Sequence, residues 1–192
     1  MRAWQVLAGG CVLAAGSAAF GQVNVALNKP VSLVSGAVGD SSAALSTLTD
    51  GTFLPRYQTW TDGTVWWTGF DAVFEIDLQG TFNLYGGIVE ADDNDAYQLW
   101  YHDLGDDSWK VLWDVPNYDA LGFGMQNRPD PDNTSTIFAF DTVVKTDKIR
   151  AVAVSGDSSN AFAEIQVYDR IPAPGATAVG VLGGLAALRR RR

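Results

Sequence analysis

The sequence places three aspartates within four residues, at Asp92, Asp93 and Asp95. Carboxylate oxygens at this density are the hard ligands that Ca²⁺ prefers. The segment lacks the glycine and the distal glutamate of an EF-hand loop. The alternative is an ordinary turn, since aspartate stabilises turns by hydrogen bonding to the nearby backbone. We keep both interpretations, a metal-binding loop and a turn, for this cluster.

Three tryptophans, Trp60, Trp66 and Trp67, lie close together ahead of an alternating apolar segment. Exposed aromatic side chains are common in binding sites, and an indole can stack on the C–H face of a sugar ring. The alternative is that these side chains close one end of a β-sandwich. Adjacent side chains of an extended segment point to opposite faces, so at most one of Trp66 and Trp67 lies in the core. We expect at least one of the three to bind a ligand.

The residue types exclude most of the common catalytic sites. The chain has one histidine, His102, and one cysteine, Cys11, which lies in a segment that we expect to be removed. A Cys–His pair and a two-histidine zinc site are therefore excluded in the mature protein. No G-x-S-x-G, Walker or complete G-x-G-x-x-G motif is present. A pair of carboxylates could still hydrolyse a glycosidic bond, but among 22 acidic residues such pairs arise by chance. We predict that the protein is not an enzyme.

Both ends of the chain have the composition of targeting segments. Residues 1–22 combine Arg2, an apolar stretch over 6–15 and small residues at 17–19, which is typical of a secretory signal peptide that is cleaved after Ala19 or Gly21. The alternative is a buried N-terminal helix. At the other end, an apolar run over 175–188 would form a helix of about 21 Å, shorter than the roughly 30 Å hydrocarbon core. We expect a temporary membrane anchor there.

The segment between these ends is strongly acidic. Residues 22–171 hold all 22 acidic residues but only eight of the 13 basic ones. Nucleic-acid binding requires clustered Lys and Arg, so we expect no nucleic-acid partner. The charge favours neutral or cationic partners and divalent metals. Residues 23–170 are the expected size of one domain.

Residues 73–103 are expected to organise that domain. Residues 74–78 alternate apolar and acidic side chains, as in a half-buried strand. Gly80 and the acidic segment 92–95 interrupt the pattern, so we predict a meander of three strands, at 74–78, 84–91 and 97–101. A lead-in strand at 24–32, a loop at 116–133 and strands at 109–115, 136–140, 148–154 and 161–168 complete the prediction. No segment has a helical period, which indicates an all-β fold.

Short motifs along residues 24–169 resemble the discoidin, or coagulation factor 5/8 type C, family. They are N-x-A-x-N-K-P-V at 24–31, L-T-D-G at 48–51, F-E-I-D-L at 74–78, N-D-A-Y at 94–97 and A-E-I-Q-V-Y at 163–168, together with the tryptophans. The resemblance implies an antiparallel β-sandwich of the galactose-binding-like (jelly-roll) type. It also implies that Asp50 and Glu164 lie side by side around a structural calcium ion.

Residues 171–192 are similar to the PEP-CTERM sorting signal of Gram-negative bacteria. They contain Pro172 and Pro174, the apolar run, and a basic cluster, Arg189, Arg190, Arg191 and Arg192. The resemblance implies transient anchoring in the inner membrane and cleavage by a sorting protease of the exosortase type.

These observations together favour an exported cell-surface or extracellular-matrix protein that binds carbohydrate, with exopolysaccharide as the expected partner. A structural matrix or biofilm protein without a discrete ligand is the alternative, and a carboxylate-based glycoside hydrolase is the other. We expect domains at 1–22 (signal peptide), 23–170 (β-sandwich) and 171–192 (sorting segment), with short apolar helices in the two terminal ones.

Overall fold

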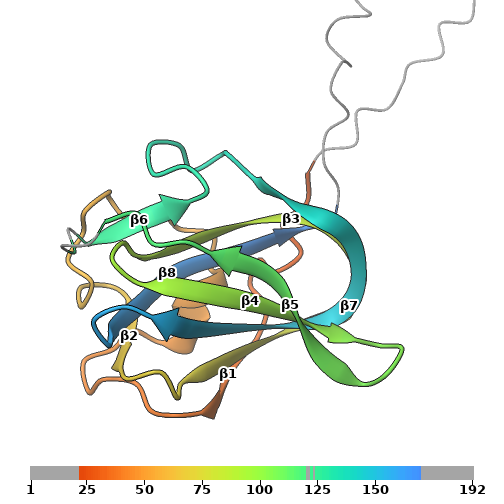
Figure 1. The fold of residues 1–192 in the computed structure, drawn as a ribbon, viewed down its shortest axis with the longest axis horizontal. Helices are drawn as coiled ribbons and strands as arrows, with labels where there is room; N and C mark the ends of the chain where they lie inside the picture. The colour runs from red at the N-terminus through yellow and green to blue at the C-terminus, as the bar shows by residue number, and fades with distance from the viewer. Residues whose placement is uncertain (1–21, 120–121, 123, 170–192) are drawn as a thin grey trace, which may run out of the picture. The chain divides into compact units, whose positions relative to one another are not determined.

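The computed structural model describes residues 22–119, 122 and 124–169 (Figure 1). These residues belong to one compact unit, Gly21–Ile171. Its strands are β1 (Val31–Ser35), β2 (Val65–Thr68), β3 (Val73–Asp92), β4 (Ala96–Asp103), β5 (Ser108–Val115), β6 (Met125–Arg128), β7 (Phe138–Ser155) and β8 (Ser159–Tyr168). One short 3-10 helix, η1 (Leu45–Thr49), precedes β2. The all-β prediction is confirmed.

The predicted signal peptide and sorting segment lie outside the described residues. Within the described part of the chain, no helix is long and apolar enough to cross a membrane.

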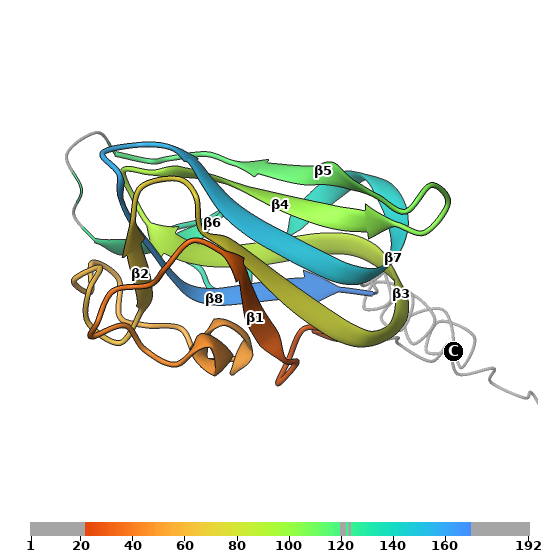
Figure 2. The ribbon, with the colours of Figure 1, turned by 90° about the horizontal axis from the view of Figure 1, so that it is seen from below.

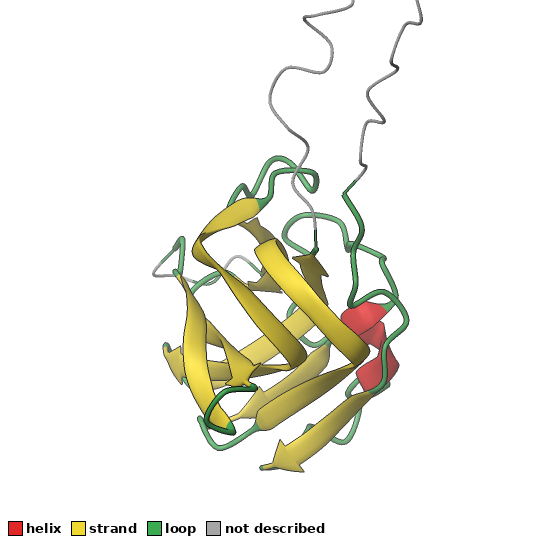
Figure 3. Ribbon diagram, turned by 90° about the vertical axis from the view of Figure 1, so that its right-hand side faces the viewer, coloured by secondary structure: helices red, strands yellow, loops and turns green. Residues whose placement is uncertain are grey.

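The strands form two layers that share the long strands β3 and β7 (Figures 2 and 3). The second half of β3 pairs with β8 on one side and with the first half of β7 and β6 on the other, and β8 also pairs with β2. The first half of β3 pairs with β1 and with the second half of β7, which continues through β4 to β5. Every one of these pairings is antiparallel, as an antiparallel β-sandwich requires.

The predicted meander of three strands is wrong. Residues 73–92 form one strand, β3, which passes Gly80 with a register shift between Asp77 and Phe82. Gln79 takes a positive φ of 56° at this point, and the strand bends rather than ends. β3 and β4 are not neighbours, because β7 lies between them. Alternation along the sequence identified strand residues, but it carries no information on which strand pairs with which.

Three further predictions need correction. The segment 116–133 contains a strand, β6, which pairs with β3, and the separate strands predicted at 136–140 and 148–154 are parts of the single strand β7. Of the predicted lead-in strand at 24–32, only Val31 and Ser32 belong to β1, with Asn24 in an isolated bridge to Tyr168. The strands predicted at 109–115 and 161–168 lie within β5 and β8.

An aromatic cluster fills the space between the layers. Trp67 is fully buried and packs against Phe74, Phe162 and Tyr97, with ring centroids 4.9, 5.3 and 6.4 Å away. These side chains come from β2, β3, β8 and β4, so the cluster ties both layers together. Aromatic contacts of this kind stabilise a fold beyond the area that they bury.

Candidate functional site

Several loops meet at the end of the sandwich that is drawn at the left of Figure 1. Main-chain hydrogen bonds join the loop at 54–64 to β6, from the Tyr57 N–H to the Met125 carbonyl and from the Met125 N–H to the Gln58 carbonyl, both 2.9 Å. Gly124 is required beside this contact, since a Cβ there would lie 2.3 Å from the Gln58 oxygen and the residue has a φ of +112°. The loop at 54–64 is therefore firmly anchored although it has no regular structure.

The three candidate tryptophans have different surroundings. Trp67 is fully buried in the core and offers no surface to a ligand. Trp66 packs against the buried Met125, and its ring fills the space that a Cβ on Gly39 would need, 2.1 Å away. Trp60 is half-buried and meets Trp66 edge-to-face, with ring centroids 5.5 Å apart. One of the adjacent pair is buried in the core, as alternation predicted. Trp60 and Trp66 are both partly exposed, but the Trp66 ring lies against Gly39 and its indole nitrogen is buried, so Trp60 is the better candidate for stacking.

Exposed polar groups accompany Trp60 on the same loop. The Gln58 side-chain amide donates to the Asp62 carboxylate over 2.6 Å. Tyr57 is 49% exposed, and the Arg56 guanidinium lies 4.5 Å from the centre of its ring. Arg56 also forms an ion pair with Asp132. An aromatic ring with amide, carboxylate and guanidinium groups beside it can bind a polyhydroxylated ring by stacking and hydrogen bonding.

The predicted calcium ligands Asp50 and Glu164 come close together. The buried Glu164 carboxylate accepts the Gly51 N–H at 3.1 and 3.2 Å and the Gln166 amide at 3.0 Å. Asp50 is exposed, and its carboxylate accepts the Thr52 N–H at 2.7 Å. Burial, with the nearby Asp50 charge, raises the pKa of Glu164 to about 8. The two acids lie near each other, as the resemblance implied.

A second buried glutamate, Glu90, adjoins this pair. Glu90 on β3 and Glu164 on β8 are register partners, so their side chains share one face of the sheet. The Glu90 carboxylate accepts the Leu54 N–H at 2.9 and 3.1 Å. Burial raises the pKa of Glu90 to about 7. The segment 51–54 is thus bound to the sheet through two buried carboxylates.

The donor set at Asp50 and Glu164 suits a hard cation, because carboxylate and main-chain oxygens are the ligands of Ca²⁺ and a divalent charge would offset the repulsion between the acids. Both Glu164 oxygens already accept hydrogen bonds from the protein. Across the described residues, no group of three or more His, Cys, Asp or Glu side chains surrounds a common metal position. A metal here would therefore depend on main-chain oxygens as well as on these two carboxylates.

The acidic cluster Asp92, Asp93 and Asp95 forms a buried turn between β3 and β4. Gln126 donates to the Asp93 carboxylate at 2.7 Å, and the Asp157 N–H donates to Asp95 at 3.1 Å. Burial raises the pKa of Asp92 to about 7 and that of Asp95 to about 6. The carboxylates bond to separate protein groups, so the structure favours the turn over the calcium loop.

Arg128 is the buried cation beside this turn. Its side chain is fully buried on β6, and its guanidinium donates to the carbonyls of Ala91, Asp92 and Gln126 at 2.7, 2.6 and 2.8 Å. The sequence analysis missed Arg128 because a single arginine in a loop-like segment carries no pattern. It missed Glu90 too, although an acid within the apolar run 84–91 is an unusual feature that could have been noticed.

No protein-family model matches the sequence, and no curated protein matches it. Solved structures do share its fold. The family 32 carbohydrate-binding module of Streptococcus pneumoniae EndoD aligns with a TM-score of 0.53 and 13% identity over 77% of this chain and 100% of that module. A Streptococcus pneumoniae fucose binding module aligns with a TM-score of 0.52 and 15% identity over 78% of this chain and 97% of that module.

A larger protein, SpGH29, contains a similar region. It aligns with a TM-score of 0.50 and 18% identity over 80% of this chain, which spans 28% of the SpGH29 chain. These similarities establish the fold of the domain: the expected galactose-binding-like β-sandwich is confirmed, and it is the fold of a family 32 carbohydrate-binding module.

Proposed function

We propose that this domain binds carbohydrate without catalysis, at the loop end of the sandwich, with Trp60 as the stacking platform. The half-open indole of Trp60 on an anchored loop carries the proposal, with the Gln58–Asp62 pair beside it. Two proteins of the same fold are described as a carbohydrate-binding module and a fucose binding module. The shared fold makes carbohydrate binding the expected function, and Trp60, Gln58 and Asp62 supply the groups that would contact a sugar.

Recognition at this site would use two kinds of contact. The apolar C–H face of a pyranose would stack on Trp60, and its hydroxyl groups would exchange hydrogen bonds with Gln58 and Asp62. The loop is held to β6 and to Glu90 before any ligand arrives, so little conformational entropy would be lost on binding.

The biological setting belongs to the same proposal. The sorting-signal resemblance of residues 171–192 supports export to the cell surface or extracellular matrix, with transient membrane anchoring and exosortase-type cleavage. At the cell surface or in the matrix, the carbohydrate that the domain would encounter is an exopolysaccharide. The acidic surface disfavours strongly anionic partners such as nucleic acid.

A glycan array followed by titration calorimetry on the full chain tests the proposal. We expect saturable binding of at least one sugar and its loss in Trp60→Ala. Trp109→Ala is the matched control, since Trp109 is also half-buried but lies on β5 away from the loop at 54–64. Unchanged affinity and stoichiometry in Trp60→Ala would refute the assigned site, and no saturable binding of any glycan would favour the structural matrix protein.

We also propose that calcium stabilises the loop that begins at Asp50. Asp50 and Glu164 would hold the ion, which would supply positive charge between two acids. A metal that binds only the folded state stabilises by RT ln(1 + [L]/Kd), about 2.7 kcal/mol at a hundredfold excess over Kd. We expect the melting temperature to rise by several degrees in calcium relative to chelator, and Asp50→Ala to remove the rise. Asp93→Ala, in the other acidic cluster, should keep it, and identical melting curves in chelator and in calcium would contradict the proposal.

A further inference from the structure

A second concave region lies between the β4–β5 hairpin and the bend of β7. Its larger part, about 430 Å³, is lined by Tyr101, the turn at 103–105 and β7 residues 142–145. The adjoining part, about 180 Å³, is lined by Tyr101, residues 111–112, residues 140–142 and Val144. Both parts share Tyr101, Thr142 and Val144, so they form one continuous cleft, which we call the β7 cleft. Its combined size lies in the range of small-molecule sites.

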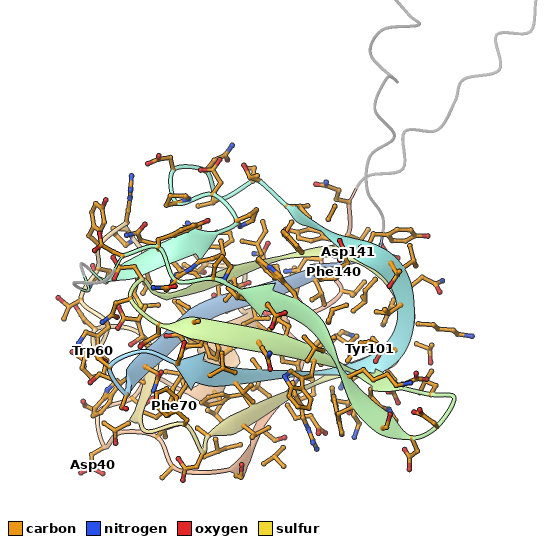
Figure 4. The ribbon with its side chains drawn as sticks, viewed as in Figure 1. Asp40, Trp60, Phe70, Tyr101, Phe140 and Asp141 are labelled. Atoms are coloured by element: carbon orange, nitrogen blue, oxygen red, sulfur yellow. The ribbon has the colours of Figure 1, made fainter. Side chains whose placement is uncertain are left out.

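The β7 cleft is far from the loop at 54–64. Figure 4 shows Tyr101, Phe140 and Asp141 towards the right of the domain and Trp60 at its left edge. Tyr101 is the last core-facing side chain of β4, after Tyr97 and Leu99. The bend of β7 brings residues 140–145 across from it. The cleft is therefore a product of strand curvature and not of a long loop.

The walls of the β7 cleft combine apolar and polar groups, and several of the apolar side chains are open to solvent. Phe140 and Val144 are 8% exposed and form its inner surface, while Leu104, Val111 and Val143 at its rim are 44, 45 and 51% exposed. An apolar surface gathered around a concave region is typical of a binding site.

Most polar side chains of the β7 cleft form no bond with the rest of the protein that the structure describes. Among the described residues, the Tyr101 hydroxyl and the side chains of Asp141, Thr142 and Lys145 form no hydrogen bond or ion pair. Asp103 differs, because it is bound by Lys110 and by the Gly105 N–H. The cleft thus combines an aromatic ring and aliphatic walls with an acid, a base and two hydroxyls that are free to bind a ligand.

We propose that the β7 cleft is a second carbohydrate site, which takes one or two rings of a neutral glycan. A pyranose has an apolar C–H face for the Tyr101 ring and the aliphatic walls, and it has hydroxyls that both donate and accept. Asp141 would accept from a sugar hydroxyl, Lys145 would donate to one, and Thr142 could do either. An anionic ligand would meet the Asp103 and Asp141 carboxylates, and a wholly apolar ligand would leave the polar groups of the rim unpaired.

This inference rests on the proposed carbohydrate-binding function and extends it. A domain with sites at 54–64 and at the β7 cleft could hold two glycan chains, or two parts of one chain, at the same time. Bivalent binding raises avidity well above the affinity of either site when the geometry allows both contacts. A protein of this kind would cross-link a polysaccharide matrix.

The test is an NMR titration of the isotope-labelled full chain with fucose, galactose and N-acetylglucosamine. We expect chemical-shift changes in two separate groups, around Trp60 and around Tyr101. Asp141→Ala should weaken binding at the cleft about ten- to a hundredfold, as expected for loss of a charged hydrogen bond. Thr142→Trp should block the cleft and abolish its shifts. Asp40→Ala is the matched control, an exposed aspartate far from Tyr101 (Figure 4).

The outcomes separate the two proposals. Cleft shifts that persist in Trp60→Ala and disappear in Asp141→Ala support the second site, whatever happens at the loop end. Shifts confined to the loop end, or cleft shifts that survive both Asp141→Ala and Thr142→Trp, overturn it and leave the proposed function intact. Absence of binding at either place overturns both. The melting temperature of each variant shows whether a loss of binding reflects unfolding, and Asp141→Ala changes only an exposed side chain.

Discussion

The stability of the domain should fall as the pH rises, because Glu90 and Glu164 are buried side by side. Both side chains are fully buried on neighbouring strands, where they are register partners. Burial raises the pKa of Glu164 from its ordinary value of 4.5 to about 8 and that of Glu90 from 4.5 to about 7. At intermediate pH the folded state therefore holds protons that the unfolded chain has released.

The sign and size of the effect follow from proton linkage. Where the folded state binds more protons than the unfolded state, the free energy of unfolding decreases as pH rises. The stabilisation is fully present below pH 4.5 and is lost as the pH passes through the raised pKa values. One pKa unit corresponds to about 1.4 kcal/mol, so Glu164 alone should lower stability by about 5 kcal/mol between pH 4.5 and pH 8.

Urea denaturation at a series of pH values between 5 and 8, in excess chelator, measures this directly. We expect wild type to lose several kcal/mol across the range and Glu164→Gln to lose about 4 kcal/mol less, because its amide does not ionise. The decline that remains comes from Glu90, Asp92 and Asp95, whose pKa values burial also raises. Adding calcium should restore part of the loss at the alkaline end, where the carboxylates are charged.

Glu75→Gln is the matched control. Burial works to raise the pKa of Glu75, but hydrogen bonds from Lys148 and Arg150 outweigh it and hold the pKa below its ordinary value. Glu75 therefore stabilises the fold above pH 4.5, and its substitution should leave the decline towards pH 8 unchanged. A wild-type profile that is flat or rising from pH 5 to 8, or the same decline in Glu164→Gln, would refute the reasoning.

Three further predictions concern packing and a surface histidine. Trp67→Ala should cost about 3 to 5 kcal/mol of unfolding free energy, measured by urea denaturation, because the fully buried indole packs against aromatic side chains of three other strands. Gly124→Ala should displace the loop at 54–64, since its Cβ would lie 2.3 Å from the Gln58 oxygen, and sugar binding should weaken in calorimetry more than the melting temperature falls. The pKa of His102 is raised by its hydrogen bond to Asp147 and then by a second one to Asp107, so this stabilisation is present below the ordinary 6.5 and lost as pH rises through the raised value. Asp147→Asn should lower the imidazole pKa in an NMR titration, and an unchanged pKa would contradict that account.

Much of the strand content could be predicted because alternation is a local property. Residues 74–78 show an apolar face and an acidic face in five consecutive positions, and the structure buries Phe74, Ile76 and Leu78 on one side. Alternation also predicted that at most one of Trp66 and Trp67 lies in the core, and the structure buries Trp67 alone of the two. Short motifs indicated the class of sandwich, and solved structures of the same fold confirm it.

Pairing and site assembly were decided by contacts between residues distant in sequence. Residues 74–78 and 84–91 belong to one bent strand because β7 hydrogen-bonds along both parts of it, and no property of the turn at Gly80 encodes that partner. Glu90 and Glu164 become a pair of neighbouring buried carboxyl groups only through the register of β3 with β8, although they are 74 positions apart along the chain. The β7 cleft likewise exists only because the bend of β7 sets Asp141 and Thr142 opposite Tyr101. Local patterns therefore determined which residues form strands and which face of each strand is apolar. The burial and pKa of the two glutamates, and the positions of the candidate sites, depended on long-range strand pairing, which the periodicity of one segment cannot specify.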